Sequence, residues 1–299
     1  GERLPGHRVY PYGGSLVHLI GYIDPRRGGP VGLESSENSL LRGFEDYSVL
    51  LPLYRARYTL LDRDIRGKDL RLTVDAELQA AVEKALKEKA GLVRNRRNGE
   101  KKYKGAAVVL DVRSGEVLAA VTLPNFDPHE LTLGSWKLYN VDRVDASVLF
   151  DRARHGAYTP GSVFKLVTAS AGLENGVDPV YDCRHQEHNV TWEYKGRCYS
   201  RRGITDLEEM GAHGRTGMRK AIRVSCNVFF ANLGLEVGPD RLYDMGRAYS
   251  LKRMPPPGKL AEDLPDNAYG QGTIQVSPLE MARVVATIAN GGVMLKPRV

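Results

Sequence analysis

Ser162 and Lys165 are the first residues in the chain whose types and spacing could do chemistry. They follow Pro160-Gly161, which ends the preceding segment, and they open an apolar helical run. Residues three apart share a helical face, so the Lys165 amine can reach the Ser162 hydroxyl. A serine becomes a nucleophile when a base takes its proton, and a lysine can act as that base if its pKa is lowered. The alternative is an N-cap serine followed by a solvated lysine.

A second polar group, Ser225-Cys226-Asn227, stands before another apolar helical run. On its own it indicates a helix boundary capped by serine. The chain, however, has Ser-x-x-Lys at a helix start after a hairpin, and then Ser-x-Asn before an apolar helix. That order of motifs is typical of penicillin-recognising serine enzymes, and it favours the catalytic interpretation of both groups.

The composition is that of a globular protein of one or two domains. The chain has 299 residues, of which 42% are hydrophobic and 26% charged, which excludes disorder, collagen and coiled coil as the main theme. No run approaches the roughly 18 apolar residues of a membrane-spanning helix. The net charge of +7 comes from mixed signs and accompanies no nucleic-acid motif, so we expect a soluble basic surface and no nucleic-acid partner.

The elements that must position these motifs follow from periodicity and turn signals. Residues 1–66 read as strands and loops of a small accessory region, including a strand at 53–60. A short strand at 70–74 precedes a helix that Asp75 caps and that runs to about Ala90. The other predicted elements are a hairpin of residues 106–112 and 117–123, and helical segments at 162–174, 216–237, 240–250 and 277–290.

Over nearly its whole length the chain resembles a class B penicillin-binding protein, a peptidoglycan D,D-transpeptidase. Trp136, ahead of the Ser162 motif, and Ala212-His213-Gly214, ahead of Ser225, are most similar to the cell-elongation type, penicillin-binding protein 2. The stretches that carry the resemblance are Arg8-Val9-Tyr10-Pro11, His18-Leu19-Ile20-Gly21-Tyr22, Gly32-Leu33-Glu34, Leu41-Arg42-Gly43, Asp69 to Asp75, Leu123 to Pro128, Gly270-Gln271-Gly272, Val276 to Ala282 and Ala289 to Gly292.

The resemblance implies an α+β fold, a penicillin-binding-protein/β-lactamase-like transpeptidase domain with an antiparallel sheet flanked by helices. Residues 1–66 would be part of the N-terminal accessory (pedestal or dimerisation) module, and residues 67–299 the transpeptidase domain. It also implies a single-pass anchor in the bacterial inner membrane, with the catalytic domain outside the cytoplasm. The implied partners are peptidoglycan stem peptides, β-lactam antibiotics and a membrane glycosyltransferase of the elongation machinery.

The family's roles carry over to four residues. Ser162 would attack the carbonyl between the two terminal D-alanines of a stem peptide, and its N–H would be half of the oxyanion hole. Lys165 would act as base and then help to protonate the leaving D-alanine. Ser225 and Asn227 would continue the proton relay and hold the donor peptide. An amine of a second stem peptide would then take the acyl group, whereas β-lactams would acylate Ser162 and remain. No cofactor is required.

Two departures from the family pattern stand out. Asp151 occupies a position where such proteins usually carry Asn, a change we expect to be tolerated. The third family motif, Lys-Ser/Thr-Gly, occurs nowhere in the chain. We therefore expect a C-terminally incomplete domain that lacks strands of its sheet and the anchor, and that is inactive and unable to fold alone in this form.

Two other functions remain open. A β-lactamase or D,D-carboxypeptidase would pass the acyl group to water, but residues 1–66 argue against it because this accessory region marks the class B proteins. A catalytically silent scaffold that activates a membrane glycosyltransferase would be consistent with the missing Lys-Ser/Thr-Gly motif.

Three cysteines leave room for a disulfide or a metal. Outside the cytoplasm, Cys183 and Cys198 could be joined across a loop of about 15 residues. Alternatively, Asp206, His213 and Cys226 could converge on a structural zinc, with Asp182 or Cys183 as the fourth ligand. In the absence of a metal, His213 would be a structural hydrogen-bonding residue and Cys226 a small buried hydrophobe.

Overall fold

The structure is a computed structural model. It describes residues 9–42, 67–90, 104–135, 148–184, 186–187, 190–206 and 211–299. These form two compact units, the first of residues 1–111, 116–155 and 297–299, and the second of residues 112–115 and 156–296. The predicted strand at 53–60, and residues 43–66 that lead up to the predicted boundary at 66, lie outside the described residues. That boundary stays a prediction.

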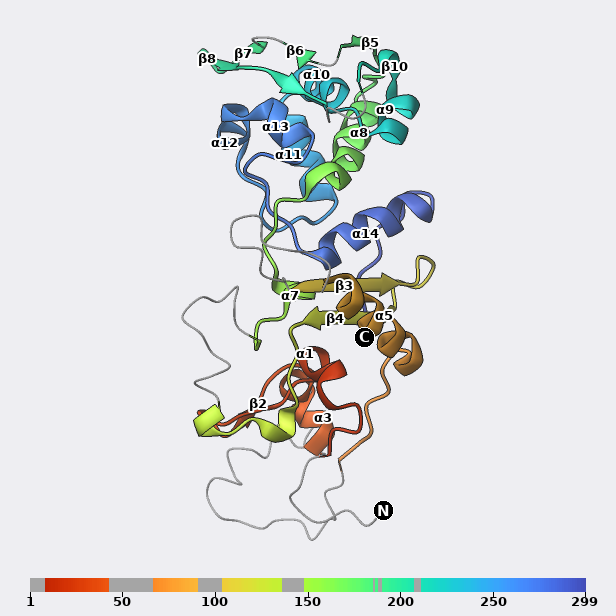
Figure 1. Cartoon of the computed structure of the whole chain (residues 1–299), viewed down its shortest axis with the longest axis vertical. Coiled ribbons are helices and arrows are strands. Elements are labelled where there is room, and N and C mark those ends of the chain that lie inside the picture. Colours follow the sequence, from red (N-terminus) through yellow and green to blue (C-terminus); the bar gives the residue numbers. More distant parts are fainter. Residues whose placement is uncertain are drawn as a thin grey trace. The chain divides into compact units, whose positions relative to one another are not determined.

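The first unit is built on an antiparallel hairpin of β3 (Gly105–Leu110) and β4 (Val117–Leu123), in which Gly105 lies opposite Leu123 and the register shifts between Val109 and Leu110. Helix α5 (Ala76–Ala90) packs against this hairpin, as Figure 1 shows. Val82 and Leu86 of the helix contact the buried side chains of Val121 and Leu123. The predicted hairpin and helix are both confirmed. Only β4, however, is almost wholly buried, whereas β3 is half-buried.

The predicted strand at 70–74 is wrong. The segment runs beside β4 and meets it through the bond from Asp75 N to Leu118 O (3.0 Å) and the bond from the Thr73 hydroxyl to Val117 O (2.8 Å). One backbone bond and one side-chain bond do not make the repeated ladder of a strand pair. Asp75 caps α5 as predicted, because its carboxylate accepts a hydrogen bond from Leu78 N at 2.9 Å.

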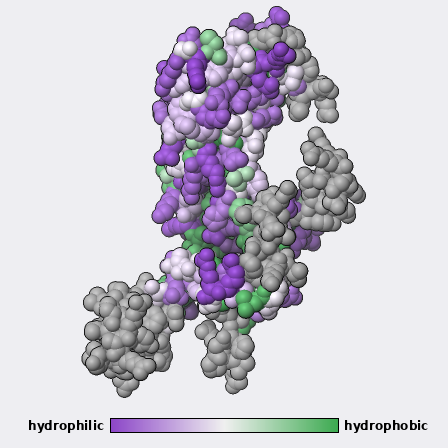
Figure 2. All heavy atoms as spheres, turned by 90° about the vertical axis from the view of Figure 1, so that its left-hand side faces the viewer, coloured by the Kyte–Doolittle hydropathy of each residue, from purple (hydrophilic) through white to green (hydrophobic). Residues whose placement is uncertain are grey.

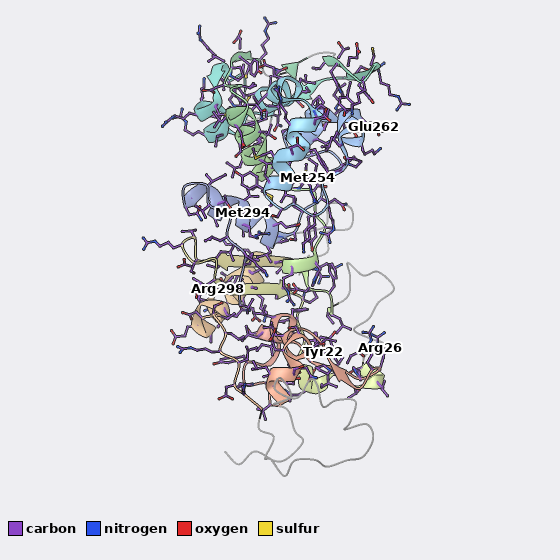
Figure 3. All side chains as sticks on the ribbon, turned by 180° about the vertical axis from the view of Figure 1, so that it is seen from behind. Tyr22, Arg26, Met254, Glu262, Met294 and Arg298 are labelled. Atoms are coloured by element: carbon purple, nitrogen blue, oxygen red, sulfur yellow. The ribbon has the colours of Figure 1, made fainter. Side chains whose placement is uncertain are left out.

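Short elements complete the first unit, and buried polar side chains join them. Gln79 is 1% exposed and bonds Ser15 O and both backbone groups of Ala120. The Tyr22 ring, labelled in Figure 3, meets Phe126 edge-on at 5.2 Å. These elements are η1 (Gly13–Leu16), α1 (Val17–Ile20), β1 (Ile23–Asp24), β2 (Gly29–Pro30), α2 (Leu33–Ser36), α3 (Asn38–Arg42), η3 (Pro128–Glu130) and α7 (Arg152–His155).

Asp151, at the start of α7, shows how its position accommodates a carboxylate. The side chain is buried, forms an ion pair with Arg154 and accepts a hydrogen bond from the Thr122 hydroxyl at 3.2 Å. The backbone N–H of Arg154 also donates to it at 3.1 Å. The charge that an Asn would lack is therefore matched by a cation three residues along the chain.

The second unit has a helical core with short antiparallel strand pairs (Figure 1). Its helices are η4 (Gly161–Phe164), α8 (Lys165–Glu174), α9 (Met218–Val224), α10 (Asn227–Val237), α11 (Pro239–Ala248), α12 (Pro257–Glu262), α13 (Leu264–Ala268) and α14 (Pro278–Ala289). Its strands are β5 (Val180–Cys183), β6 (Gln186–Glu187), β7 (Val190–Tyr194), β8 (Arg197–Arg201), β9 (Ile204–Thr205) and β10 (Gly214–Gly217).

Helix α10 lies in the core of the second unit and packs against α8 and α13. Its residues Phe229, Phe230 and Leu233 are fully buried. Gly234 lies so close to α13 that a Cβ there would stand 2.2 Å from the Cβ of Ala268. On the neighbouring α11, Gly246 leaves room for Met254, which is labelled in Figure 3. Close helix packing of this kind holds the catalytic candidates on rigid elements.

The predicted helical segments of this unit are confirmed, with one interruption. The segment expected at 216–237 is broken into α9 and α10 at Ser225, whose φ of 53° and ψ of 45° are left-handed. The first turn of the predicted 162–174 helix is the 3₁₀ turn η4.

All five strand pairs among the described residues are antiparallel, and the predicted α+β class is confirmed. The disulfide considered for Cys183 and Cys198 is not present in the structure, where neither cysteine is bonded to another. Cys183 is buried in β5, which pairs with β10, whereas Cys198 is exposed in β8, which pairs with β7.

The face shown in Figure 2 carries mostly hydrophilic residues, with small hydrophobic patches between them. Within the described ranges, no helix combines the length and the apolar character needed to cross a bilayer.

Candidate active site

Lys165 lies where α8 approaches the junction of α9 and α10. Its Nζ donates to the Ser225 hydroxyl at 2.9 Å, to the Ser225 carbonyl at 2.5 Å and to Asn227 Oδ1 at 2.7 Å. It also lies 5.8 Å from the centre of the Phe230 ring. Three of the four predicted catalytic residues thus meet through one amine, although 60 residues separate them in the chain.

The environment of Lys165 favours the neutral amine. The side chain is 3% exposed, and burial lowers its pKa to about 8, against the attraction of Asp206 and Cys226. A lysine with an ordinary pKa is almost fully protonated at neutral pH and is a poor base. With a pKa of about 8, about a tenth of the amine is neutral at pH 7.

Ser162 lies in η4, one turn before Lys165, and is exposed. In a 3₁₀ helix the side chains at i and i+3 eclipse one another, so Ser162 and Lys165 share one face. The Ser162 hydroxyl is not among the three hydrogen-bond partners of Lys165. The structure therefore places Ser162 and Lys165 on one face of the turn, with Ser162 exposed and Lys165 buried.

Ser225 owes its position to an unusual backbone. It ends α9 in the left-handed region, and its N–H donates to Ile222 O at 3.2 Å. This reversal lets the carbonyl and hydroxyl of one residue bind the same amine. Serine is not a residue that commonly adopts positive φ.

Asn227 is held from both sides. Its backbone N–H donates to Asp206 Oδ1 at 2.5 Å, and its Nδ2 donates to Thr205 O in β9 at 3.0 Å. The second bond makes Oδ1 the acceptor that faces Lys165. The carboxamide orientation is therefore fixed by β9, which sequence reasoning did not anticipate because a main-chain acceptor leaves no residue-type signal.

Behind this site, the three predicted metal ligands also converge. The ligand atoms of Asp206, His213 and Cys226 all lie within 4.8 Å of one another. His213 Nδ1 is 3.1 Å from Asp206 Oδ2, but its geometry makes no hydrogen bond, and both buried ring nitrogens are left without a hydrogen-bond partner. A buried imidazole without partners is costly, and a metal ion would satisfy it.

Cys226 is a protonated thiol in this arrangement. Its Sγ donates to Asp206 Oδ2 at 3.3 Å and accepts from Phe229 N at 3.3 Å, which caps α10. A hydrogen bond with Cys183 and burial raise the pKa of the Cys226 thiol. Of the two candidates for a fourth ligand, Cys183 is buried beside this thiol and Asp182 is exposed.

Sequence reasoning missed the role of the segment Gly270-Gln271-Gly272. Gly161, just before Ser162, donates its N–H to Gly270 O at 2.8 Å. A Cβ at Gly270 would lie 2.0 Å from Gly161 O. The signal was the Gly-x-Gly spacing, which marks close backbone approach but does not name the partner.

Residues 105–299, more than half of the chain, match the family model of the penicillin-binding protein transpeptidase domain. Together with the fold, this match shows that the chain belongs to the penicillin-binding proteins of class B.

The D,D-transpeptidase PbpA of Mycolicibacterium smegmatis is 28% identical over 97% of this chain and 59% of its own length. Penicillin-binding protein A of Mycobacterium tuberculosis was solved as an imipenem acyl-enzyme complex. It has a TM-score of 0.75 at 26% identity, and the match covers 97% of this chain and 67% of that chain. A structure of a peptidoglycan synthase complex that coordinates polymerization and crosslinking has a TM-score of 0.61 at 30% identity, with coverage of 80% and 47%. The chain spans about half the length of the curated relatives it matches.

Proposed function

We propose that the protein containing this chain is a serine D,D-transpeptidase that cross-links peptidoglycan stem peptides. The observation that carries the proposal is the buried Lys165 amine, which binds Ser225 and Asn227 and shares a face with the exposed Ser162. The family match and the related acyl-enzyme structure support the same chemistry.

In the proposed reaction, neutral Lys165 takes the proton of Ser162 Oγ as this oxygen attacks the carbonyl of the penultimate D-alanine. The C–N bond breaks, and the terminal D-alanine leaves with a proton supplied through Lys165 and Ser225. The amine of a second stem peptide then attacks the ester, loses its proton to the same base and releases Ser162. Asn227 Oδ1 holds Lys165, and Nδ2, which gives one of its two hydrogens to Thr205 O, has a second hydrogen with which to hold the donor peptide.

Labelling of the natural full-length protein with a fluorescent penicillin tests this proposal. We expect the wild type to label and Ser162→Ala not to label. Ser170→Ala is the matched control, because Ser170 lies on the same helix and bonds Leu166 O and Tyr249 instead. Wild-type protein that stays unlabelled would favour the silent scaffold. In the reaction with stem peptides, a product of trimmed monomers without cross-linked dimers would indicate a hydrolase.

We further propose that the protein acts in the cell-elongation machinery, from a single-pass anchor in the inner membrane and beside a membrane glycosyltransferase. The similarity to a chain of a peptidoglycan synthase complex supports a synthase partner. His213, one of the residues that suggested the elongation type, lies beside the Ser225 segment, whereas Trp136 lies outside the described residues. Co-purification of the full-length protein with a glycosyltransferase from membranes tests this; purification without one would contradict it.

We also propose a structural zinc held by Asp206, His213, Cys226 and Cys183. The donor set of one oxygen, one nitrogen and two sulfurs suits zinc, and the unpartnered His213 ring supports a ligand there. When bound, the ion would hold the two thiols as thiolates. Metal analysis of the purified protein should find one zinc per chain, reduced in His213→Ala and unchanged in His129→Ala. Protein without zinc would rule out the proposal.

A further inference from the structure

We propose that residues 264–273, which comprise α13 and the loop after it, form a brace that sets the position of Ser162 relative to Lys165. Within this arrangement the hydroxyl of Thr168 and the carboxamide of Asn267 are positioning groups for acylation. The inference rests on the proposed function, because it assigns these residues to the reactivity of Ser162.

The first contact of the brace is with the turn that carries Ser162. Gly161 donates its N–H to Gly270 O at 2.8 Å. The approach is backbone to backbone, since a Cβ at Gly270 would lie 2.0 Å from Gly161 O, and Gly270 has a φ of +84°. No flexible side chain lies between the brace and the turn, so a shift of Gly270 passes directly to Gly161.

The second contact is with α8 on the other side of Lys165. Thr168 is fully buried, and its hydroxyl donates to Ala268 O at 2.7 Å. Ala268 is the last residue of the five-residue helix α13, whose final carbonyls have no partner within the helix. The brace therefore holds α8 at Thr168 and its preceding turn at Gly161, with Ser162 and Lys165 between the two contacts.

Asn267 keeps the brace in one shape. Its side chain is fully buried; Oδ1 accepts from Thr273 N at 2.8 Å, and Nδ2 donates to Leu260 O at 3.1 Å. Its carbonyl accepts from Gly270 N at 3.1 Å. A Cβ at Gly272 would lie 2.3 Å from Asn267 Oδ1, so the loop closes tightly around the carboxamide.

Asp266 ties the brace to the hairpin of β7 and β8. Its carboxylate accepts two hydrogen bonds from Arg201, at 2.6 and 3.1 Å, and one from the Tyr269 hydroxyl. Its carbonyl accepts from Gln271 N at 2.8 Å. A bidentate arginine–carboxylate interaction fixes both distance and orientation. Helix α13 is therefore held by this ion pair as well as by its packing.

The catalytic turn needs such support because it has little of its own. Ser162 is exposed, and η4 has no side-chain cap. Hydrogen bonds of a 3₁₀ turn are poorly aligned. A misplacement of about 1 Å between reacting groups can lower a rate by about a hundredfold. The contacts at Gly161 and Thr168 therefore add to the burial of Phe164 in holding the nucleophile and its base in position.

The test compares Thr168→Val, which keeps the shape and removes the hydroxyl, with Thr168→Ser, which keeps the hydroxyl. In the natural full-length protein, the acylation rate at saturating penicillin is measured separately from the affinity of the non-covalent complex. We expect Thr168→Val to lower the rate about tenfold or more with affinity unchanged, and Thr168→Ser to stay near wild type. Thr287→Val, which removes a buried hydroxyl from α14, is the matched control.

Hydrogen exchange at the Gly161 amide provides a readout that needs no reaction, and Thr168→Ala replaces Thr168→Val if the latter does not fold. Faster exchange is expected in the variants without the hydroxyl. Equal acylation by wild type and Thr168→Val, or equal losses in Thr168→Val and Thr168→Ser, would overturn the brace while leaving the proposed function intact. If the wild type is not acylated, or if Ser162→Ala is acylated as fast as the wild type, both the brace and the proposed function are overturned.

Discussion

At the scale of single residues, Lys165 combines two opposing influences. Three acceptor oxygens stabilise its ammonium form, while burial destabilises it, and burial prevails because the pKa falls to about 8. Asp206 and Cys226 oppose the shift. The result is an amine that changes protonation near neutral pH, as the proposed base must, whereas an ordinary surface lysine does not.

The pH dependence of acylation follows from this pKa. Below pH 8 the neutral fraction of Lys165 falls about tenfold per pH unit, so the acylation rate should rise from pH 6, reach half its maximum near pH 8 and level off about one pH unit higher. Stopped-flow measurement with a chromogenic β-lactam checks this. Lys165→Arg should be inactive, because arginine does not deprotonate, whereas Lys252→Arg should match the wild type. A flat profile between pH 6 and 8 would contradict the role of Lys165.

The same shift predicts a change in stability. An unfolded lysine has a pKa near 10.4, so between about pH 8 and 10.4 the unfolded state binds more protons than the folded one. The free energy of unfolding should therefore rise with pH across this window, and the destabilisation by Lys165 should be complete below it. Urea unfolding of the wild type and Lys165→Met at several pH values should show this rise only in the wild type. If the free energy of unfolding changes with pH in the same way in the two proteins, the predicted effect of Lys165 is contradicted.

At the scale of elements, α14 has the best-defined start in the second unit. The Ser277 hydroxyl accepts from Glu280 N at 3.2 Å, and Glu280 accepts in return from Ser277 N at 2.7 Å, which is a capping box. The second carboxylate oxygen accepts from Lys252 N at 2.9 Å. Both side chains are buried, so neither can turn to water when its partner is removed.

Substitutions in this capping box should therefore differ in their cost. Ser277→Ala should lower the free energy of unfolding by about 1 kcal/mol. Glu280→Ala should lower it by more, about 2–3 kcal/mol, because it removes the acceptor both of the buried Ser277 N–H and of the partly buried Lys252 N–H. Chemical denaturation measures both, with Glu280→Gln as the control that keeps an acceptor. A Glu280→Ala variant no less stable than Ser277→Ala would contradict the shared role of the carboxylate.

The elements also show where sequence reasoning succeeds and fails. Helix α5 was predictable because Asp75 caps a periodic apolar run that packs on β4. The strand at 70–74 failed because an alternating pattern does not say whether a partner strand supplies a full ladder. The break at Ser225 was hidden in a continuous helical pattern, since a left-handed residue is held there by tertiary contacts.

At the scale of the whole molecule, the four predicted catalytic residues and the three predicted ligands all lie in the second unit. Spacing placed Ser162 and Lys165 on one helical face, and the order of the motifs then favoured a catalytic pairing over a capping serine with a solvated lysine. The meeting of Lys165 with Ser225 and Asn227 came from the resemblance, because no local rule relates residues 60 positions apart. The contacts of the brace with Gly161 and Thr168, and the contact at Thr205, each end on a main-chain carbonyl, which every residue type carries, so these partners were not predictable.

The zinc proposal has a consequence for global stability. Asp206 and His213 flank residues 207–210, and Cys226 caps α10, so an ion would join β9, the start of β10 and the central helix. Removal of zinc with a strong chelator should lower the Tm of the full-length protein, and added zinc should restore it. Calorimetry checks this. A Tm unaffected by the chelator in zinc-loaded protein would contradict a structural role, and His213→Ala should show no response.

The left-handed backbone of Ser225 places stability and reactivity in opposition at one residue. A positive φ costs a side-chain-bearing residue roughly 1–2 kcal/mol, which glycine does not incur. Ser225→Gly and Ser225→Ala both lose the hydroxyl that binds Lys165. The glycine variant should nevertheless be the more stable of the two by about 1 kcal/mol. This order reverses the usual one, in which alanine stabilises a helix more than glycine does. Both variants should be acylated poorly. The backbone at this position thus favours glycine, whereas only the serine supplies the hydroxyl that binds Lys165.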